Sequence, residues 1–183
     1  ELDAQIYIFH NEASFVFNEL IKTYHVSTIF SSQEIGNGLT FERDKNMQTL
    51  FKKNNIEWNE YQTNGIIRKL KSRENWEKLW EQKMTETPKI VNETNLNIIK
   101  LDDTIYTILK GEDLDKEITT RNKNFQEGGE YWAWRYMDSF IKERYINYSK
   151  HISKPLLSRK GCSRLSPYIT YGNISMRMVY QYT

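Results

Sequence analysis

Apolar and polar residues follow two different patterns along this chain, which separates its first part from its last part. Three short runs rich in β-branched and aromatic residues have the length and composition of buried strands: 5–10, 27–31 and 56–61. Between them, apolar residues recur at helical spacing over 15–24 and 41–51. Strands that alternate with helices in this order predict a partial parallel α/β sheet with right-handed crossovers.

The last part of the chain is predicted to be helical. One helix is expected after Gly128-Gly129-Glu130, because apolar residues recur at helical spacing from Ala133 to Tyr148. Ser166-Pro167 predicts the start of another, with the serine as N-cap and the proline at the first helical position. In the first part, Ser14 is the expected N-cap and Thr40 the expected opening residue of the two helices there.

The segment between these parts has no sustained period. A basic stretch, 66–73, comes before a helix-like spacing over 76–84. Residues 88–124 are rich in Asn, Thr, Asp and Lys, which predicts an inter-domain connection with a short helix around 105–109.

Composition narrows the class of protein. The chain has 183 residues, 27% of them charged, and a mean hydropathy of −0.75, so a soluble, cytoplasmic protein without a membrane span is expected. The single cysteine, Cys162, cannot form an internal disulfide and favours a reducing compartment. The net charge of +2 is too small to indicate a nucleic-acid partner by itself. The chain opens at Glu1 without a methionine, which suggests a processed or partial chain.

Most common catalytic patterns are absent from the sequence. The three histidines share no metal-ligand spacing, so no metal site is expected. No GxSxG motif is present, and Gly36-Asn37-Gly38 lacks both the Lys-Ser/Thr of a Walker loop and a full GxGxxG. Catalytic residues therefore stay unassigned.

One segment, 161–168, combines features that suit a phosphate group. Ser163 and Ser166 place two hydroxyls beside free backbone N–H groups at a predicted helix start, and Arg164 lies between them. This arrangement would suit a pyrophosphate. The alternative is helix capping by Ser166, which physical reasoning alone favours because Ser-Pro usually has that role.

The same segment resembles a family signature. Ser163 to Tyr168, with Gly172 and Ser175, is similar to the (Thr/Ser)-Ser-x-Leu-Ser-Pro-Tyr-x-x-x-Gly-x-x-Ser motif of the DNA photolyase/cryptochrome family. Other landmarks of that family, including those of its bacterial branch, occur in the same order: 31–37, 41–44, 64–70, Trp76, Trp80, 128–130, Phe140, Arg144 and Tyr148. The resemblance covers nearly the whole chain and is weakest over 88–124.

The resemblance implies a fold that is α/β followed by all-α. Residues 1–87 would form the C-terminal part of an α/β antenna domain, 88–124 an inter-domain connection, and 125–183 the start of a helical FAD-binding domain. The chain is then expected to be an internal fragment. A first strand would precede it, and the electron-transfer tryptophans and any iron–sulfur ligands would follow it.

The resemblance also implies a flavin site. Tyr148 falls at the tyrosine that packs on FAD, while Cys162, Ser163, Arg164, Leu165 and Ser166 fall on the loop that wraps its phosphates. Cys162 stands where the family commonly has threonine, and a thiol is a weaker hydrogen-bond donor than a hydroxyl. An antenna chromophore of unknown identity is a further expected cofactor.

The implied function is light-driven repair of damaged DNA. Reduced flavin would donate an electron to a pyrimidine dimer flipped from the duplex, a carbon–carbon lyase reaction of the full-length protein that the chain alone is not expected to perform. One alternative is a cryptochrome-type photoreceptor without repair. Another, from a different class, is a non-flavin α/β domain that binds nucleic acid.

The basic stretch provides two candidate DNA contacts, Arg68 and Arg73. Trp76 and Trp80 follow at helical spacing, which would place aromatic rings beside the two cations. The alternative, favoured on physical grounds, is a solvated helix face with the tryptophans in the core.

Overall fold

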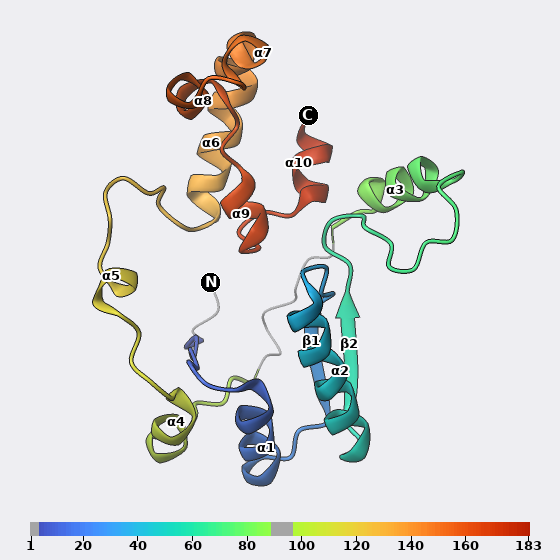
Figure 1. Cartoon of the computed structure of the whole chain (residues 1–183), viewed down its shortest axis with the longest axis vertical. Coiled ribbons are helices and arrows are strands. Elements are labelled where there is room, and N and C mark those ends of the chain that lie inside the picture. The colour runs from blue at the N-terminus through green and yellow to red at the C-terminus, as the bar shows by residue number, and fades with distance from the viewer. Residues whose placement is uncertain (1–3, 89–96) are drawn as a thin grey trace. The chain divides into compact units, whose positions relative to one another are not determined.

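The computed structural model describes residues 4–88 and 97–183, which form two compact units (Figure 1). The first unit comprises Glu1–Gln62 and Lys89–Arg121, and the second comprises Thr63–Pro88 and Asn122–Thr183. This grouping cuts the chain differently from the boundaries expected at 87 and 124. The assignment of antenna and flavin domains stays a prediction.

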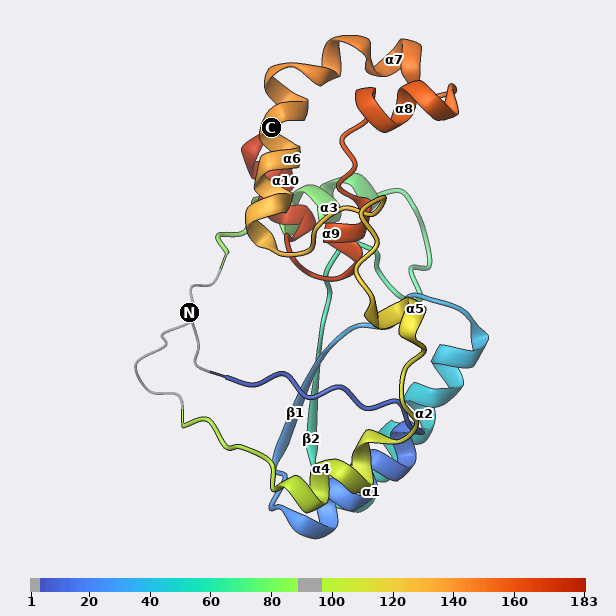
Figure 2. The ribbon, with the colours of Figure 1, turned by 90° about the vertical axis from the view of Figure 1, so that its left-hand side faces the viewer.

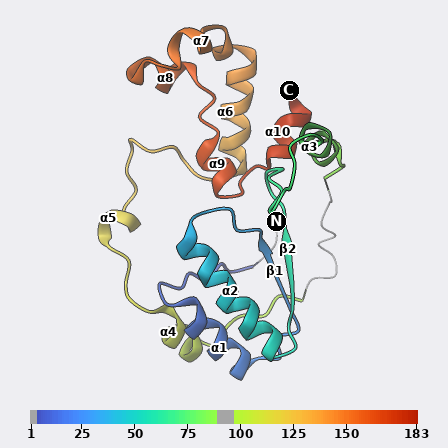
Figure 3. The ribbon, with the colours of Figure 1, turned by 45° about the vertical axis from the view of Figure 1, so that its right-hand side comes forward.

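A parallel strand–helix–strand motif forms the centre of the first unit. Strand β1 (Thr28–Ser32) pairs with β2 (Glu57–Tyr61) in parallel, from Thr28↔Glu57 to Ser32↔Tyr61. Helix α2 (Gly38–Lys53) connects the two strands and lies against them (Figure 3). The prediction of a mixed α/β fold with a parallel βαβ unit is therefore confirmed for this part.

Aromatic packing joins this motif to α1 (Ala13–Thr23). Phe51 on α2 is buried and meets the rings of Phe17 and Trp58 edge-on at 5.0 and 5.3 Å between centroids. Met47 and Ile56 complete the buried cluster. Edge-to-face contacts of this kind contribute beyond the area they bury, so they fix α1 and α2 on one side of the strands.

The predicted strand over 5–10 is wrong. Within the described residues, only His10 finds a backbone partner there, in an isolated parallel bridge to Gly111 with a His10 N to Lys110 O distance of 2.8 Å. The rings of Tyr7 and Phe9 instead pack on Tyr106 of α4 (Asp103–Lys110), at 5.5 and 6.2 Å. The segment thus uses its alternating apolar residues against a helix, which lies beside α1 (Figure 2).

Helix boundaries in the first unit differ from the predicted ones by a few residues. Ser14 lies inside α1, whose cap position holds Glu12 without a side-chain hydrogen bond. Helix α2 begins at Gly38 because the side chain of Asn37 accepts a hydrogen bond from the N–H of Thr40 at 3.2 Å. The short helix expected around 105–109 is confirmed as α4, and α5 (Lys116–Thr119) was not predicted.

Helices connected by loops make up the second unit, and its described residues contain no strand. Its buried cluster consists of Ala133, Met137, Leu165, Tyr168 and Ile174. Its helices are α3 (Trp76–Thr85), α6 (Glu130–Lys142), the 3-10 turn η2 (Arg144–Asn147), α7 (Tyr148–His151), α8 (Pro155–Gly161), α9 (Ser166–Thr170) and α10 (Met176–Tyr182). No described helix in either unit has the length and apolar character needed to span a membrane.

The helix predicted to continue to Tyr148 breaks at Glu143, whose backbone leaves helical geometry at φ −135° and ψ −53°. The break lets the side chain of Arg144 turn back onto α6, where its Nη2 donates to the carbonyl of Tyr136 at 2.6 Å. The periodic pattern does not reveal this break, because apolar residues continue on both sides of it.

Helix α3 packs against α10 in this unit. Arg177 Nε donates to Lys83 O at 3.0 Å and also pairs with Glu86 at 2.9 Å, and Gln181 donates to Met84 O at 2.8 Å. These two side chains donate to the last carbonyls of α3 and to the carboxylate of Glu86, which explains why 63–88 groups with the helical segment.

Candidate functional site

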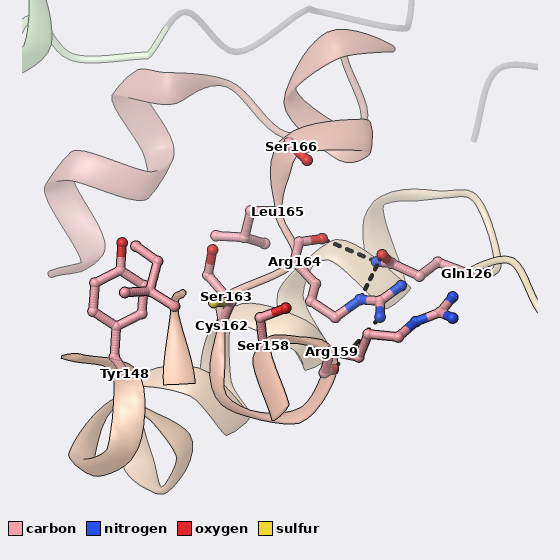
Figure 4. Close-up of a pocket in the computed structure, with 10 residues that line it drawn as sticks. Gln126, Tyr148, Ser158, Arg159, Cys162, Ser163, Arg164, Leu165 and Ser166 are labelled. Atoms are coloured by element: carbon pink, nitrogen blue, oxygen red, sulfur yellow. Dashed lines mark hydrogen bonds between the residues drawn. The ribbon is translucent and has the colours of Figure 1, made fainter. Parts of the chain in front are cut away.

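A pocket of about 470 Å³ in the second unit gathers all six residues predicted to bind the cofactor (Figure 4). It is open to solvent and lies between α7, α8 and the loop that leads into α9. The six residues are Tyr148, Cys162, Ser163, Arg164, Leu165 and Ser166, and the remaining lining comes from Gln126, Ile152, Ser158 and Arg159. The volume falls in the range of small-molecule sites.

Several residues of the signature have structural roles. Leu165 and Tyr168 belong to the core, with 6% and 2% of their surface exposed. Burial raises the pKa of Tyr168, so its hydroxyl stays protonated and donates to Glu127 O at 2.7 Å. Gly172 has a φ of 70°, and Ser175 caps α10 by accepting from Met178 N at 3.1 Å. These four residues would be needed to fold this unit with or without a ligand.

The two serines beside Arg164 have no such structural role. Ser166 was predicted as an N-cap, and this is wrong: Leu165 occupies the cap position and no side chain caps α9. Leu165 already has helical φ and ψ and accepts from Ile169 N at 3.0 Å, so the helix begins one residue earlier than expected. In the described structure, the hydroxyls of Ser163 and Ser166 form no hydrogen bond.

Backbone donors are also available at this loop. The N–H groups of Ser163, Arg164, Leu165 and Ser166 have no hydrogen-bond acceptor among residues 4–88 and 97–183. Two of the residues that carry them are half-buried, and orphan N–H groups are rare where water is restricted. Together with the two hydroxyls, they form a set of donors without protein acceptors on the wall of one pocket.

Arg164 is held in place by a reciprocal pair of hydrogen bonds. Its Nε donates to Gln126 Oε1 at 2.9 Å, and Gln126 Nε2 donates back to Arg164 O at 2.9 Å (Figure 4). Its Nη1 also lies 3.5 Å from Arg159 O. Arg164 has a φ of 62°, which is uncommon for a residue with a side chain, and the clamp by Gln126 stabilises this conformation.

The charge of the pocket comes from two guanidinium groups. Arg159 and Arg164 both line it, and none of the lining residues is acidic. Arg159 has no carboxylate partner within the described chain. A pocket with two cations and no carboxylate attracts anions, and guanidinium groups match the oxygens of a phosphate.

An aromatic side chain forms another wall of the pocket. Tyr148 is 40% exposed, and Phe140 supports its ring edge-on at 5.8 Å. Cys162 lies half-buried between this ring and Arg164, with its N–H bonded to Ser158 O at 3.0 Å. The pocket thus offers an aromatic face on one side and cations on the other.

Sequence reasoning missed three polar lining residues, Gln126, Ser158 and Arg159. Gln126 gives no local signal, because its partner Arg164 is 38 positions away. Arg159 could have been found, since the Arg159-Lys160 pair directly precedes the signature. A guanidinium group close to hydroxyls in the sequence suits the oxygens of a phosphate.

The two predicted DNA contacts, Arg68 and Arg73, lie in different environments. Arg73 lines a second cavity of about 630 Å³ in the same unit, together with Ile66, Ile67, Lys69, Leu70 and Trp76, whereas Arg68 is half-buried and is not one of the lining residues. The expected helix face is wrong, because 66–75 is not helical. Trp76 is 42% exposed, and Trp80 is half-buried against Tyr180 at 5.1 Å between ring centroids, so neither tryptophan lies fully in the core.

The described residues contain no group of three or more His, Cys, Asp or Glu side chains that could hold a metal ion. No protein-family model matches the chain, and no curated protein matches it.

Proposed function

We propose that the pocket around Ser163 and Ser166 binds the diphosphate of FAD, in a light-driven flavoprotein that resembles the DNA photolyases. The observation that supports this most directly is the absence of a structural role for the two serines. Their hydroxyls bond to nothing in the described structure, yet they line a pocket with two arginines. Hydroxyls, N–H groups and guanidinium groups are the donors that a diphosphate requires.

Each residue then has a specific part in binding. Arg159 and Arg164 would neutralise the diphosphate, and Ser163 and Ser166 would donate to its oxygens. Tyr148 would pack against a flat ring system, since it presents an exposed aromatic face on the same pocket. When bound, FAD would supply the light absorption and the electron that splits a pyrimidine dimer; the residues described here bind and orient it.

The pocket supports flavin binding more directly than it supports DNA repair. A cryptochrome-type photoreceptor would use the same pocket, so repair of damaged DNA rests on the family resemblance. One observation favours a nucleic-acid contact: Lys69, Lys71 and Arg73 have no acidic partner in the described part of the chain. Cations left unpaired beside an exposed tryptophan are typical of surfaces that contact nucleic acid.

The test is a double substitution, Ser163→Ala with Ser166→Ala, in the protein that contains this chain. Two neutral hydrogen bonds would be lost, each worth about 0.5–1.5 kcal/mol, so flavin retention should fall roughly tenfold to a hundredfold. Retention can be measured as the ratio of bound flavin to protein after gel filtration at increasing dilution.

Ser158→Ala is the matched control. Ser158 lines the same pocket, but its hydroxyl donates to Pro155 O at 3.0 Å and is therefore already used. This variant should keep its flavin. If the double variant also retains flavin as the unchanged protein does, the two serines do not face the diphosphate and the proposal fails.

A further inference from the structure

Arg144 is the most heavily hydrogen-bonded side chain near the pocket, although it does not line it. A guanidinium group has five N–H donors, and each of them has an acceptor here. The acceptors are Ser139 Oγ at 3.1 Å, Tyr136 O at 2.6 Å, Ser163 O at 3.3 Å, Lys160 O at 3.5 Å and Cys162 O. No carboxylate pairs with Arg144 within the described residues.

The surroundings of Arg144 make these contacts strong. The side chain is half-buried, and its guanidinium lies 5.8 and 5.7 Å from the ring centroids of Tyr136 and Phe140. Burial lowers the pKa of Arg144, yet a guanidinium stays protonated in proteins. A charged donor shielded from water binds carbonyl oxygens more strongly than a neutral one does.

Three of the five acceptors are carbonyls at 160, 162 and 163, where α8 ends and the loop toward α9 begins. The carbonyl of one residue and the N–H of the next point in opposite directions across a trans peptide, and no cis peptide occurs in the described chain. When Arg144 turns the carbonyls of Cys162 and Ser163 toward itself, it therefore turns the N–H groups of Ser163 and Arg164 away. These are two of the pocket residues whose N–H groups have no acceptor in the described structure.

We infer that Arg144 is the positioning residue of the pocket: by their carbonyls it holds the end of α8 and the start of the following loop, and so presents the N–H groups of Ser163 and Arg164 to an anion. The hold on the loop follows from the contacts alone, while the identity of the anion as a diphosphate rests on the proposed function. Arg144 acts through the backbone and does not touch the ligand.

Arg144→Lys tests the hold on the loop. A lysine keeps the charge but presents a single compact ammonium, which cannot satisfy five acceptors in a fixed fork. Cys162 is the only cysteine of the chain; it carries one of the held carbonyls and directly precedes another, so its thiol reports on the loop. We expect its alkylation by iodoacetamide to become about tenfold faster, the factor that corresponds to about 1.4 kcal/mol.

Arg135→Lys, on the neighbouring helix α6, is the matched control. Arg135 lies 5.8 and 5.0 Å from the ring centroids of Tyr131 and Trp132 and bonds to no carbonyl of the loop in the described structure. It should leave the alkylation rate unchanged. The rate in Arg144→Lys should also be independent of low urea concentrations, because local opening exposes little surface whereas global unfolding exposes much.

Flavin retention in the protein that contains this chain completes the test. Faster alkylation together with lower retention supports the inference. An unchanged alkylation rate overturns it whatever happens to the flavin, and so does faster alkylation with full retention when the Ser163 and Ser166 variant loses flavin. If that double variant keeps its flavin while alkylation is faster in Arg144→Lys, the proposed function fails and the hold on the loop stands.

Discussion

The second unit contains two cavities that carry positive charge in different ways. The pocket at Ser163 is organised by fixed hydrogen bonds, since Gln126 clamps Arg164 and Arg144 holds the loop behind it. The cavity at Arg73 has exposed, apolar walls, and its cations, Lys69 and Arg73, bond to nothing in the described chain. A site whose donors are held in place suits one ligand geometry, whereas free cations suit any phosphate backbone.

The largest effect concerns how much of a flavin the pocket can hold. Its described lining contains one aromatic ring, Tyr148, and it is open to solvent (Figure 4). A flat ring system left half in water gains little from apolar burial. We therefore expect the 183-residue chain alone to purify without colour and to bind FAD more weakly than about 1 µM, or about −8 kcal/mol, in equilibrium dialysis. Micromolar or tighter binding would show that this pocket is a complete flavin site.

A smaller effect is expected when the clamp on Arg164 is removed. Gln126→Leu keeps the approximate size of the side chain but deletes both hydrogen bonds to Arg164, so flavin retention in the protein that contains this chain should fall about tenfold. Gln181→Leu is the control. It removes two hydrogen bonds that the side-chain amide donates to the carbonyls of Met84 and Glu86, away from the pocket lining. Equal losses in both variants would mean that general destabilisation, and not the clamp, lowers retention.

The smallest effect concerns the salt dependence of DNA binding. If the cations near the second cavity contact phosphates, replacing Arg68 and Arg73 by alanine in the protein that contains this chain should reduce the slope of log K against log salt by roughly one to two units. The structure sharpens this test. Lys69→Ala with Arg73→Ala should account for the reduction, because both line the cavity.

Lys71→Ala tests whether DNA binding depends on the second cavity or only on the positive charge of the segment. Lys71 belongs to the same segment and has no acidic partner in the described residues, but it does not line the cavity. Its substitution should change the slope less than that of Arg73 does. Equal slopes in all variants, including the unchanged protein, would indicate that this segment only faces water.

The sequence was informative where a local pattern decides the structure. Strands β1 and β2, helix α2 and the short helix α4 follow from spacing and composition, because burial of one face fixes each of them. The segment 5–10 has the same kind of pattern, yet its rings pack on Tyr106 and its backbone remains almost unpaired. Alternation predicts which side chains are buried, but it does not reveal what they are buried against.

The site shows the same division between local and long-range information. The motif pointed to Tyr148 and to 162–166, which one pocket brings together. Gln126 and the carbonyl contacts of Arg144 could not be predicted, because they depend on how separate helices pack. Ser166 was misassigned as a cap for a related reason: the αL backbone of Arg164 precedes a Leu165 that is already helical, and the helix starts early.

Gly111 illustrates how a surface position can be intolerant of mutation. It is exposed, but its φ of 72° and its closeness to the carbonyl of His10 leave no room for a Cβ atom. The bridge between His10 and Gly111 is the single backbone pairing that the described residues of 4–10 make. A methyl group at position 111 would therefore break this bridge. A burial profile that scores only interior positions would not mark this exposed residue as sensitive.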